Sequence, residues 1–356
     1  MKNIKKISIT SSSDFVCNFN LSLHNIIKRL NHIDEKFILI VDDNHKLVGT
    51  VTDGDLRRAM LKDNISTQDK IKEYMNKDPY IGKPGESSKN IKKLSLIDLQ
   101  MPFLPVVDKN NLLIEVLISN KEIRSVQTAL ILAGGKGSRL GDLTKNTPKP
   151  LLNIDGAPIL RKILNKLDKE GFKNVYISVY HLSEKFEKFI DTYNSKMTIN
   201  LLYEPFALGT AGSIGLLPTQ IDENILVMNG DILTNVNFQN LFTMHLKHNY
   251  DLTIAAALNK IKVEFGVIEY NEDYQFEKIN EKPVLEHFIN AGLYCLSKSV
   301  VSLVGKNQNI DMPKLIEISK SSGQKIGVFP MHEDWIDLGS PKDFDSIKNK
   351  VNKNEK

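Results

Sequence analysis

Residues 131–152, ILAGGKGSRLGDLTKNTPKPLL, place four glycines and four cationic side chains directly after an apolar run. Glycine lets backbone N–H groups approach a ligand without interference from a Cβ, and the cations add positive charge, so we expect an anion-binding turn. Two familiar phosphate loops are excluded by spacing. No glycine lies five residues before a Gly-Lys-Ser/Thr triplet, and Leu140 stands where G-x-G-x-x-G requires its third glycine.

The order of residues in this stretch resembles the signature of the sugar-1-phosphate nucleotidyltransferase family, L-A-G-G-x-G-[ST]-R-L, then L-T, then P-K-P-L. The resemblance implies that the loop binds a nucleoside triphosphate and that Arg139 and Lys149 stabilise the departing pyrophosphate. The alternative is a glycine-rich turn with solvated cations. The nucleotide-binding residues implied here are Leu132, Ala133, Gly134, Gly135 and Gly137.

Two later aspartates match the family's metal ligands. Asp231 closes MNGD (228–231), and Asp337 lies in WIDLGSP (335–341). The resemblance implies that both bind one catalytic Mg²⁺ ion, for which two carboxylates and phosphate oxygens are usual ligands. Taken alone, Asp231 is more typical of a turn and Asp337 of a helix cap, because aspartate is common in both settings.

Three further segments, GTAGSI (209–214), EKP (281–283) and NAGLY (290–294), follow in the family's order. The first implies contacts with the nucleotide. In the others, the resemblance implies that Lys282 grips the sugar phosphate as a catalytic residue, while Glu281 and Asn290 meet the sugar. A glycine-rich helix start and a surface lysine are the alternatives. The remaining residues implied are Gly209, Thr210 and Ala211 for the nucleotide and Gly266 beside the sugar.

The reaction implied is attack of a sugar-1-phosphate on a nucleoside triphosphate, giving a nucleotide sugar and pyrophosphate by Mg²⁺-dependent in-line displacement. The LGTAG form resembles guanylyltransferases, so we expect GTP. A CBS pair before such a domain resembles most closely the glucosamine-1-phosphate guanylyltransferases of bacterial legionaminic acid biosynthesis. Alternatives are mannose- or heptose-1-phosphate guanylyltransferases, uridylyl- or thymidylyltransferases, and an inactive nucleotide-sensing regulatory subunit.

The N-terminal half contains a worn internal repeat, FILIVDDNHKLVGTVTDGDLRRAM (37–60) and FLPVVDKNNLLIEVLISNKEIRSV (103–126). It resembles a tandem pair of CBS (cystathionine-β-synthase) domains. In GTVTDGD, Thr52 and Asp55 match that family's ribose-binding motif, whereas the second copy has Ser119 and Glu122. We expect one regulatory nucleotide site, at Thr52 and Asp55; the alternative is that the two residues only cap a helix.

Hydrophobic patterning predicts the elements that position these residues. Apolar strand segments alternate with helical ones after Thr128, which indicates an α/β fold with a mostly parallel, Rossmann-like mixed sheet. The expected strands are 128–133, 174–180, 199–204, 224–228, 252–258, 266–270, 288–296 and 326–330. The expected helices are 158–170, 183–194, 209–217, 238–248, 312–321 and 341–352. We divide the chain into a tandem CBS (α+β) module over 1–125 and a nucleotidyltransferase domain over 126–356.

Composition limits the partners. The 356 residues are 41% hydrophobic and 25% charged, which is typical of a globular protein with a real core. A net charge of +4 is too weak to favour nucleic acid, and no segment reaches membrane-spanning length. Two distant cysteines predict neither disulfides nor a cysteine metal site. We therefore expect a cytoplasmic homo-oligomer that uses an NTP and a sugar-1-phosphate.

Overall fold

The computed structural model divides into two units, Met1–Arg124 and Ser125–Lys356. The residues that it describes are 4–10, 13–33, 35–62, 66, 68–97, 101–119, 127–221 and 223–339. The helix expected over 341–352 lies outside them.

The first unit holds two three-stranded sheets, one for each repeat. One has the order β2-β3-β4 and the other β1-β6-β5. Both contribute to one core, in which Phe37 and Phe103 stack at 4.0 Å between ring centroids. The strands are β1 Ile4–Ser8, β2 Val16–Asn18, β3 Phe37–Val41, β4 Leu47–Thr52, β5 Phe103–Val107 and β6 Leu113–Ser119. The helices are α1 Leu23–His32, α2 Asp53–Met60, η1 Ile71–Glu73 and α3 Ser87–Leu96.

The two repeats agree in strand register. Phe37 faces Thr52 across β3 and β4, and Phe103 faces Ile118 across β5 and β6, and both pairs of strands carry a bulge at the same relative place. The strand β6 has one residue more than β4, so each second strand still ends on a hydroxyl residue, Thr52 or Ser119. The repeat predicted from the sequence is therefore present as strand, turn and strand in both copies.

The second unit is built on a seven-stranded sheet with the order β11-β10-β7-β12-β17-β14-β18. Only β17 runs antiparallel to its neighbours within this sheet, so the mostly parallel mixed sheet is confirmed. Its strands are β7 Thr128–Leu132, β10 Asn174–Val179, β11 Thr198–Tyr203, β12 Ile225–Asn229, β14 Leu252–Lys262, β17 Val284–Leu296 and β18 Ile326–Met331.

Successive residues of β7 enter two different cores. Ala129 and Ile131 pack with α4 (Ile159–Lys169), α5 (Ser183–Asp191) and α7 (Phe238–Lys247). Leu130 packs on the other face. The helices there are α6 (Gly209–Gly212), α8 (Lys298–Val301) and α9 (Met312–Ser321). Both faces of the sheet are thus covered, which explains the nearly continuous apolar run in β7.

Several short elements were not expected from the sequence. They are the paired strands β8 (Asn153–Ile154) and β9 (Ala157–Pro158), the paired strands β13 (Ile232–Thr234) and β19 (Trp335–Asp337), β16 (Phe276–Asn280), α8, and the turns η2 (Ser138–Thr144) and η3 (Lys149–Leu151). The helix expected over 209–217 is split into α6 and η4 (Ser213–Leu216).

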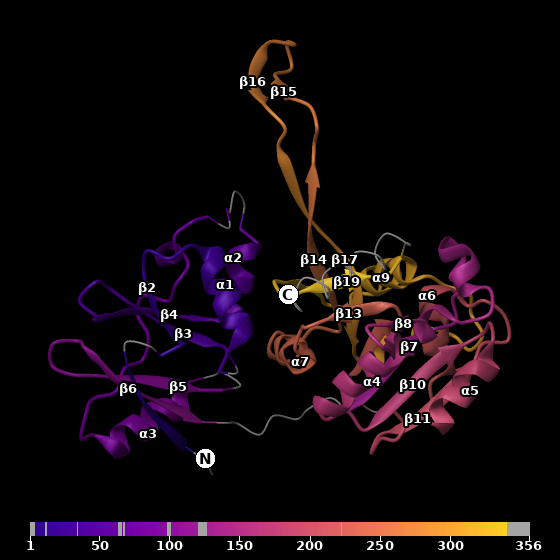
Figure 1. The fold of residues 1–356 in the computed structure, drawn as a ribbon, viewed down its shortest axis with the longest axis horizontal. Coiled ribbons are helices and arrows are strands. Elements are labelled where there is room, and N and C mark those ends of the chain that lie inside the picture. Colours follow the sequence, from indigo (N-terminus) through magenta and orange to yellow (C-terminus); the bar gives the residue numbers. More distant parts are fainter. Residues whose placement is uncertain are drawn as a thin grey trace. The chain divides into compact units, whose positions relative to one another are not determined.

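A long arm projects from the sheet. The outer parts of β14 and β17 run beyond the other strands and carry at their far end a two-stranded sheet of β15 (Val267–Tyr270) and β16 (Figure 1). No residue between 260 and 287 is buried. We call these residues the arm. Within the described part of the chain, every helix is too short or too polar to cross a bilayer.

Candidate functional site

A cavity of about 400 Å³ opens at the carboxyl ends of β7 and β12. These neighbouring strands lie where the order of the sheet reverses direction, and such a point is the usual ligand site of an open α/β sheet. The residues lining it are Leu132, Ala133, Gly134, Gly135, Gly137, Ser138, Arg139, Leu140, Lys149, Pro150, Ser178, Glu204, Ala207, Leu208, Gly209, Thr210, Asn229, Gly230, Asp231, Asp337 and Gly339. Eleven of the residues predicted from the sequence are therefore brought together.

The glycine-rich loop forms one wall. Gly137 has a φ of +65°, and its carbonyl accepts a hydrogen bond of 2.9 Å from the Thr144 hydroxyl, which ties the loop to the turn that follows. Gly135 is exposed, and a Cβ placed there would meet nothing within 4 Å. Arg139 is also exposed at the rim. The loop thus presents open backbone and a cation to a ligand.

Lys149 lies between the two predicted metal ligands. Its ammonium group pairs with the Asp231 carboxylate and lies 3.8 Å from Oδ1 of Asp337. The antiparallel pair of β13 and β19 brings the two aspartates together, because Asp337 faces Ile232, the residue after Asp231. The Leu338 N–H also donates to the Asp231 carbonyl, at 3.2 Å.

This donor set suits Mg²⁺. The ammonium group of Lys149 forms an ion pair with each of the two carboxylates, so both oxygen groups face one positive charge. Carboxylate oxygens are the ligands that Mg²⁺ prefers in proteins. Asp231 and Asp337 would hold the ion, and Lys149 would then be displaced from between them.

Glu204, which none of the sequence motifs indicated, forms the floor behind the glycine loop. Its side chain is buried, and a Cβ on Gly134 would lie only 2.8 Å from Cδ of Glu204. Burial raises the pKa of the Glu204 carboxyl, while hydrogen bonds from the Leu208 N–H and the Ser178 side chain act in the opposite direction. A carboxyl group held by two donors thus lines the cavity directly behind Gly134, where a larger side chain would collide with it.

The segment that begins at Gly209 is anchored to the turn before α9. Gly209 has a φ of +77°, and a Cβ there would lie 2.6 Å from the Ile310 carbonyl oxygen. Thr210 donates through its N–H to Asp311, and its hydroxyl accepts from the Met312 N–H, at 2.9 and 2.8 Å. Gly209 and Thr210 line the cavity, whereas Ala211 is fully buried beneath it.

The predicted sugar-phosphate residues lie elsewhere. Gly266, Glu281 and Lys282 belong to the arm and are absent from the lining listed above, as is Asn290 of β17. Lys282 has a φ of +47°, a conformation that is uncommon outside glycine and concentrated at functional sites. A Cβ on Gly266 would lie 2.8 Å from Oε2 of Glu281, so these two do meet. Their role in sugar binding stays a prediction.

In the first unit, Thr52 and Asp55 form a complete capping box at the start of α2. The Thr52 N–H donates to Oδ2 of Asp55 at 2.8 Å, and the Asp55 N–H donates to the Thr52 hydroxyl at 3.3 Å. Oδ1 of Asp55 pairs with Arg58. Both carboxylate oxygens are thus engaged by protein groups. A nucleotide at this place stays a prediction, and its ribose would have to displace these partners.

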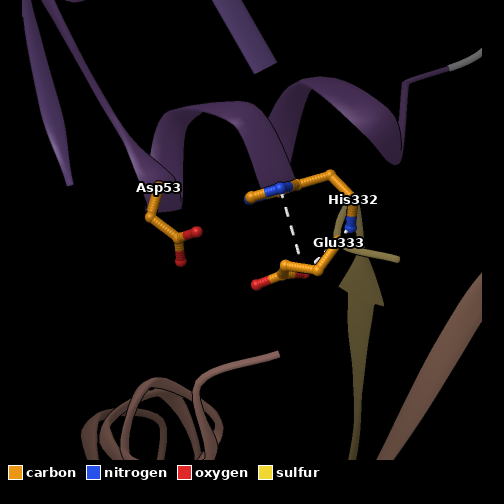
Figure 2. A group of neighbouring side chains, drawn as sticks. All are labelled: Asp53, His332 and Glu333. Carbon is orange, nitrogen blue, oxygen red and sulfur yellow. Dashed lines mark hydrogen bonds and ion pairs between the residues drawn. The ribbon is translucent and has the colours of Figure 1, made fainter. Parts of the chain in front are cut away.

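Other charged side chains that the sequence analysis did not select appear in Figure 2. In the second unit, the His332 N–H donates to Oε2 of Glu333 at 3.1 Å, directly after β18. In the first unit, Asp53 begins α2 and accepts two hydrogen bonds of 2.8 Å from Arg57. Neither group lines the cavity.

Both units resemble known protein families. The family model described as nucleotidyl transferase matches residues 128–354, and the CBS domain model matches residues 4–62. The chain is 31% identical over 236 residues to the mannose-1-phosphate guanylyltransferase catalytic subunit beta of Drosophila melanogaster, covering 64% of this chain and 63% of that protein. It is also 31% identical over 224 residues to mannose-1-phosphate guanyltransferase beta-A of Xenopus laevis, covering 61% and 62%.

Among solved structures, the crystal structure of HddC from Yersinia pseudotuberculosis has a TM-score of 0.51 and 23% identity. The alignment covers 64% of this chain and all of that one. The same fold therefore occurs in HddC. By contrast, the chain spans less than two thirds of the length of the two mannose-1-phosphate guanyltransferases from Drosophila melanogaster and Xenopus laevis.

Proposed function

Because the chain belongs to the nucleotidyl transferase family, we propose that it transfers a guanylyl group from GTP to a sugar-1-phosphate and releases pyrophosphate. The observation that carries the proposal is the convergence of the glycine-rich loop, Lys149, Asp231 and Asp337 on one cavity. Mannose-1-phosphate guanylyltransferases at 31% identity support the same reaction class.

The reaction needs positioning and charge more than proton transfer. A phosphate oxygen of the sugar-1-phosphate forms a bond to the α-phosphorus of GTP, and the bond from that phosphorus to the oxygen bridging to the β-phosphate breaks. The sugar phosphate is already anionic near neutral pH, so no general base is required. Arg139 at the rim and Lys149 inside the cavity would neutralise charge on the departing pyrophosphate. A bound Mg²⁺ would supply further neutralisation of phosphate charge.

Glu204 supports guanine as the base. The Watson–Crick edge of guanine has two adjacent donors, N1–H and the N2 amino group, and a carboxylate accepts from both. Adenine places an acceptor beside its donor, and uracil places acceptors on both sides of its single N–H. A buried carboxylate in the floor of the cavity would therefore favour guanine, because other bases would leave it unpaired or facing an acceptor.

For the sugar, glucosamine-1-phosphate is the first candidate. It rests on the arrangement of a CBS domain ahead of the transferase domain, which is an argument from resemblance. Mannose-1-phosphate is the second candidate, since the names of the relatives favour it. The two sugars differ at C2, where one carries an amine and the other an axial hydroxyl.

The test is a matrix of four NTPs against glucosamine-, mannose- and glucose-1-phosphate with Mg²⁺, read by pyrophosphate release. We expect the largest kcat/KM with GTP and glucosamine-1-phosphate. A preference for mannose-1-phosphate would correct the sugar, and a preference for UTP or dTTP would refute the guanylyl assignment. No pyrophosphate with any pair would favour the inactive nucleotide-sensing alternative.

The role of Glu204 is tested in the same assay with Glu204→Gln. An amide offers one acceptor in place of two, so we expect kcat/KM for GTP to fall at least tenfold more than kcat/KM for UTP. Glu187→Gln serves as a matched control, because Glu187 is an exposed glutamate of α5 that pairs with Tyr203 and is absent from the cavity lining. Equal losses for both nucleotides in Glu204→Gln would mean that Glu204 supports the loop without reading the base.

A further inference from the structure

One face of the two-stranded sheet at the end of the arm is entirely apolar. Directly opposed residues of antiparallel strands share a face, and here Ile268 faces Ile279 and Tyr270 faces Phe276. All four side chains are between 53% and 65% exposed. We call these four residues the apolar face. Tyr274 extends it by stacking on Tyr270, with 6.4 Å between ring centroids.

The opposite face of the same sheet is polar. Glu269 faces Lys278 and Val267 faces Asn280, and the Asn280 amide donates to Oε1 of Glu269 at 2.7 Å. The hairpin therefore has one face suited to water and one suited to a partner. The bulge between Glu269 and Tyr270 maintains this division, because it skips a residue of β16 so that Phe276 opposes Tyr270.

The apolar face of this hairpin would be stabilised by packing against another surface. An isolated two-stranded sheet is marginally stable in water, and independent stability requires further strands or packing on a hydrophobic face. Exposed Phe and Tyr side chains are also enriched at protein interfaces relative to other surfaces. In Figure 1, β15 and β16 stand at the far end of the arm, beyond the seven-stranded sheet of their own unit, so the other strands of that sheet do not cover this face.

We propose that the apolar face binds the same face of a second copy of this chain. A twofold axis through the hairpin would place Tyr270 and Phe276 of one copy against those of the other, as isologous contacts require. Burying one Phe or Tyr removes roughly 150–250 Å² from water. The three aromatic and two aliphatic side chains of this surface are between 53% and 87% exposed, so their burial would supply a large part, but not all, of the ~800 Å² per partner that a stable interface uses. The arm also carries both signs of charge, so two copies need not repel each other.

The test is analytical ultracentrifugation of the full chain between about 1 and about 100 μM, with no substrate present. The wild type should sediment as a dimer of the 40.3 kDa chain. The double variant Ile268→Lys with Phe276→Lys places charges on the apolar face, and we expect the dimer dissociation constant to rise at least a hundredfold, since each of two central side chains contributes about tenfold.

The matched control is Glu269→Lys with Lys278→Glu, which reverses the charge pair on the polar face of the same hairpin and leaves the net charge unchanged. It should remain a dimer with the wild-type dissociation constant. Unchanged melting temperatures of the larger unit would show that neither variant disturbs the main sheet. A monomeric wild type, or a dimer that persists in the apolar-face variant, would overturn the proposal.

Discussion

Replacing Lys149 by methionine should strengthen the binding of a divalent cation in the cavity while it weakens the proposed catalysis. Lys149 is the cation that contacts both Asp231 and Asp337. The variant removes a competitor for the space between the carboxylates. We therefore expect Lys149→Met to bind a divalent cation more tightly than the wild type when no nucleotide is present, although it loses a group proposed to assist the departing pyrophosphate.

The size of the effect follows from the geometry. Two unit charges 3.8 Å apart, the distance to Asp337, interact by about 4 kcal/mol at an effective dielectric constant near 20 and by about 1 kcal/mol in water. Asp337 is 45% exposed, which favours the lower figure, while Asp231 is 23% exposed and closer to Lys149. A gain of at least tenfold in cation affinity, about 1.4 kcal/mol, is therefore expected.

The assay is titration with Mn²⁺, a paramagnetic substitute for Mg²⁺, followed by electron paramagnetic resonance or calorimetry without nucleotide. Lys162→Met is the control, because Lys162 pairs with a single carboxylate, Asp155, outside the cavity lining. It should leave Mn²⁺ affinity unchanged. Equal or weaker Mn²⁺ binding by Lys149→Met would refute the view that the lysine occupies the position of the metal.

Three further outcomes are expected. Asp231→Asn and Asp337→Asn should each lower kcat by several orders of magnitude, and the double variant should lose far less than the product if both serve one ion, as steady-state kinetics can show. Gly209→Ala should destabilise the protein by about 2 kcal/mol or more in urea unfolding, because of its positive φ and its contact with a carbonyl, whereas Gly156→Ala, with a φ of +78° and open space, should cost only about 1 kcal/mol. Burial lowers the pKa of His245 to about 4, below its unfolded value near 6.5, so its stabilising contribution is complete above about pH 6.5 and is lost as pH falls toward 4. In the wild type, the free energy of unfolding measured by urea titration should fall by about 3 kcal/mol between pH 7 and 4 because of His245. In the His245→Gln variant this part of the decrease should be absent.

The main sheet could be predicted because its strands carry long apolar runs. All eight strand segments expected after Thr128 are present, and so are the helices expected within the described residues, with the one at 209–217 divided. The strands β13 and β19 were missed because each has three residues, too few to show periodicity, and their pairing spans more than a hundred residues. Long-range pairing of this kind leaves no local signal in the sequence.

The candidate site was predicted unevenly for a related reason. Resemblance to the family's motifs predicts Gly134, Lys149 and Asp231, and the structure places all three in the lining of the cavity. Glu204 could not be selected, because the residues on either side of it do not show that its carboxyl group passes behind Gly134. The projection of the arm from the sheet could not be predicted either. Alternation of apolar and polar residues predicts a strand, but it does not show whether that strand stays within the main sheet.

The pairing of β13 with β19 also sets an order of events during synthesis on the ribosome. The first unit, β7 and Asp231 emerge first, but Asp337 follows Asp231 by more than a hundred residues. At about 5–20 residues per second, this delay is roughly 5–20 s. Until then a nascent chain has the glycine-rich loop and only one of the two carboxylates. Every incomplete chain that ends before β19 therefore lacks the pair of carboxylates that faces the cavity.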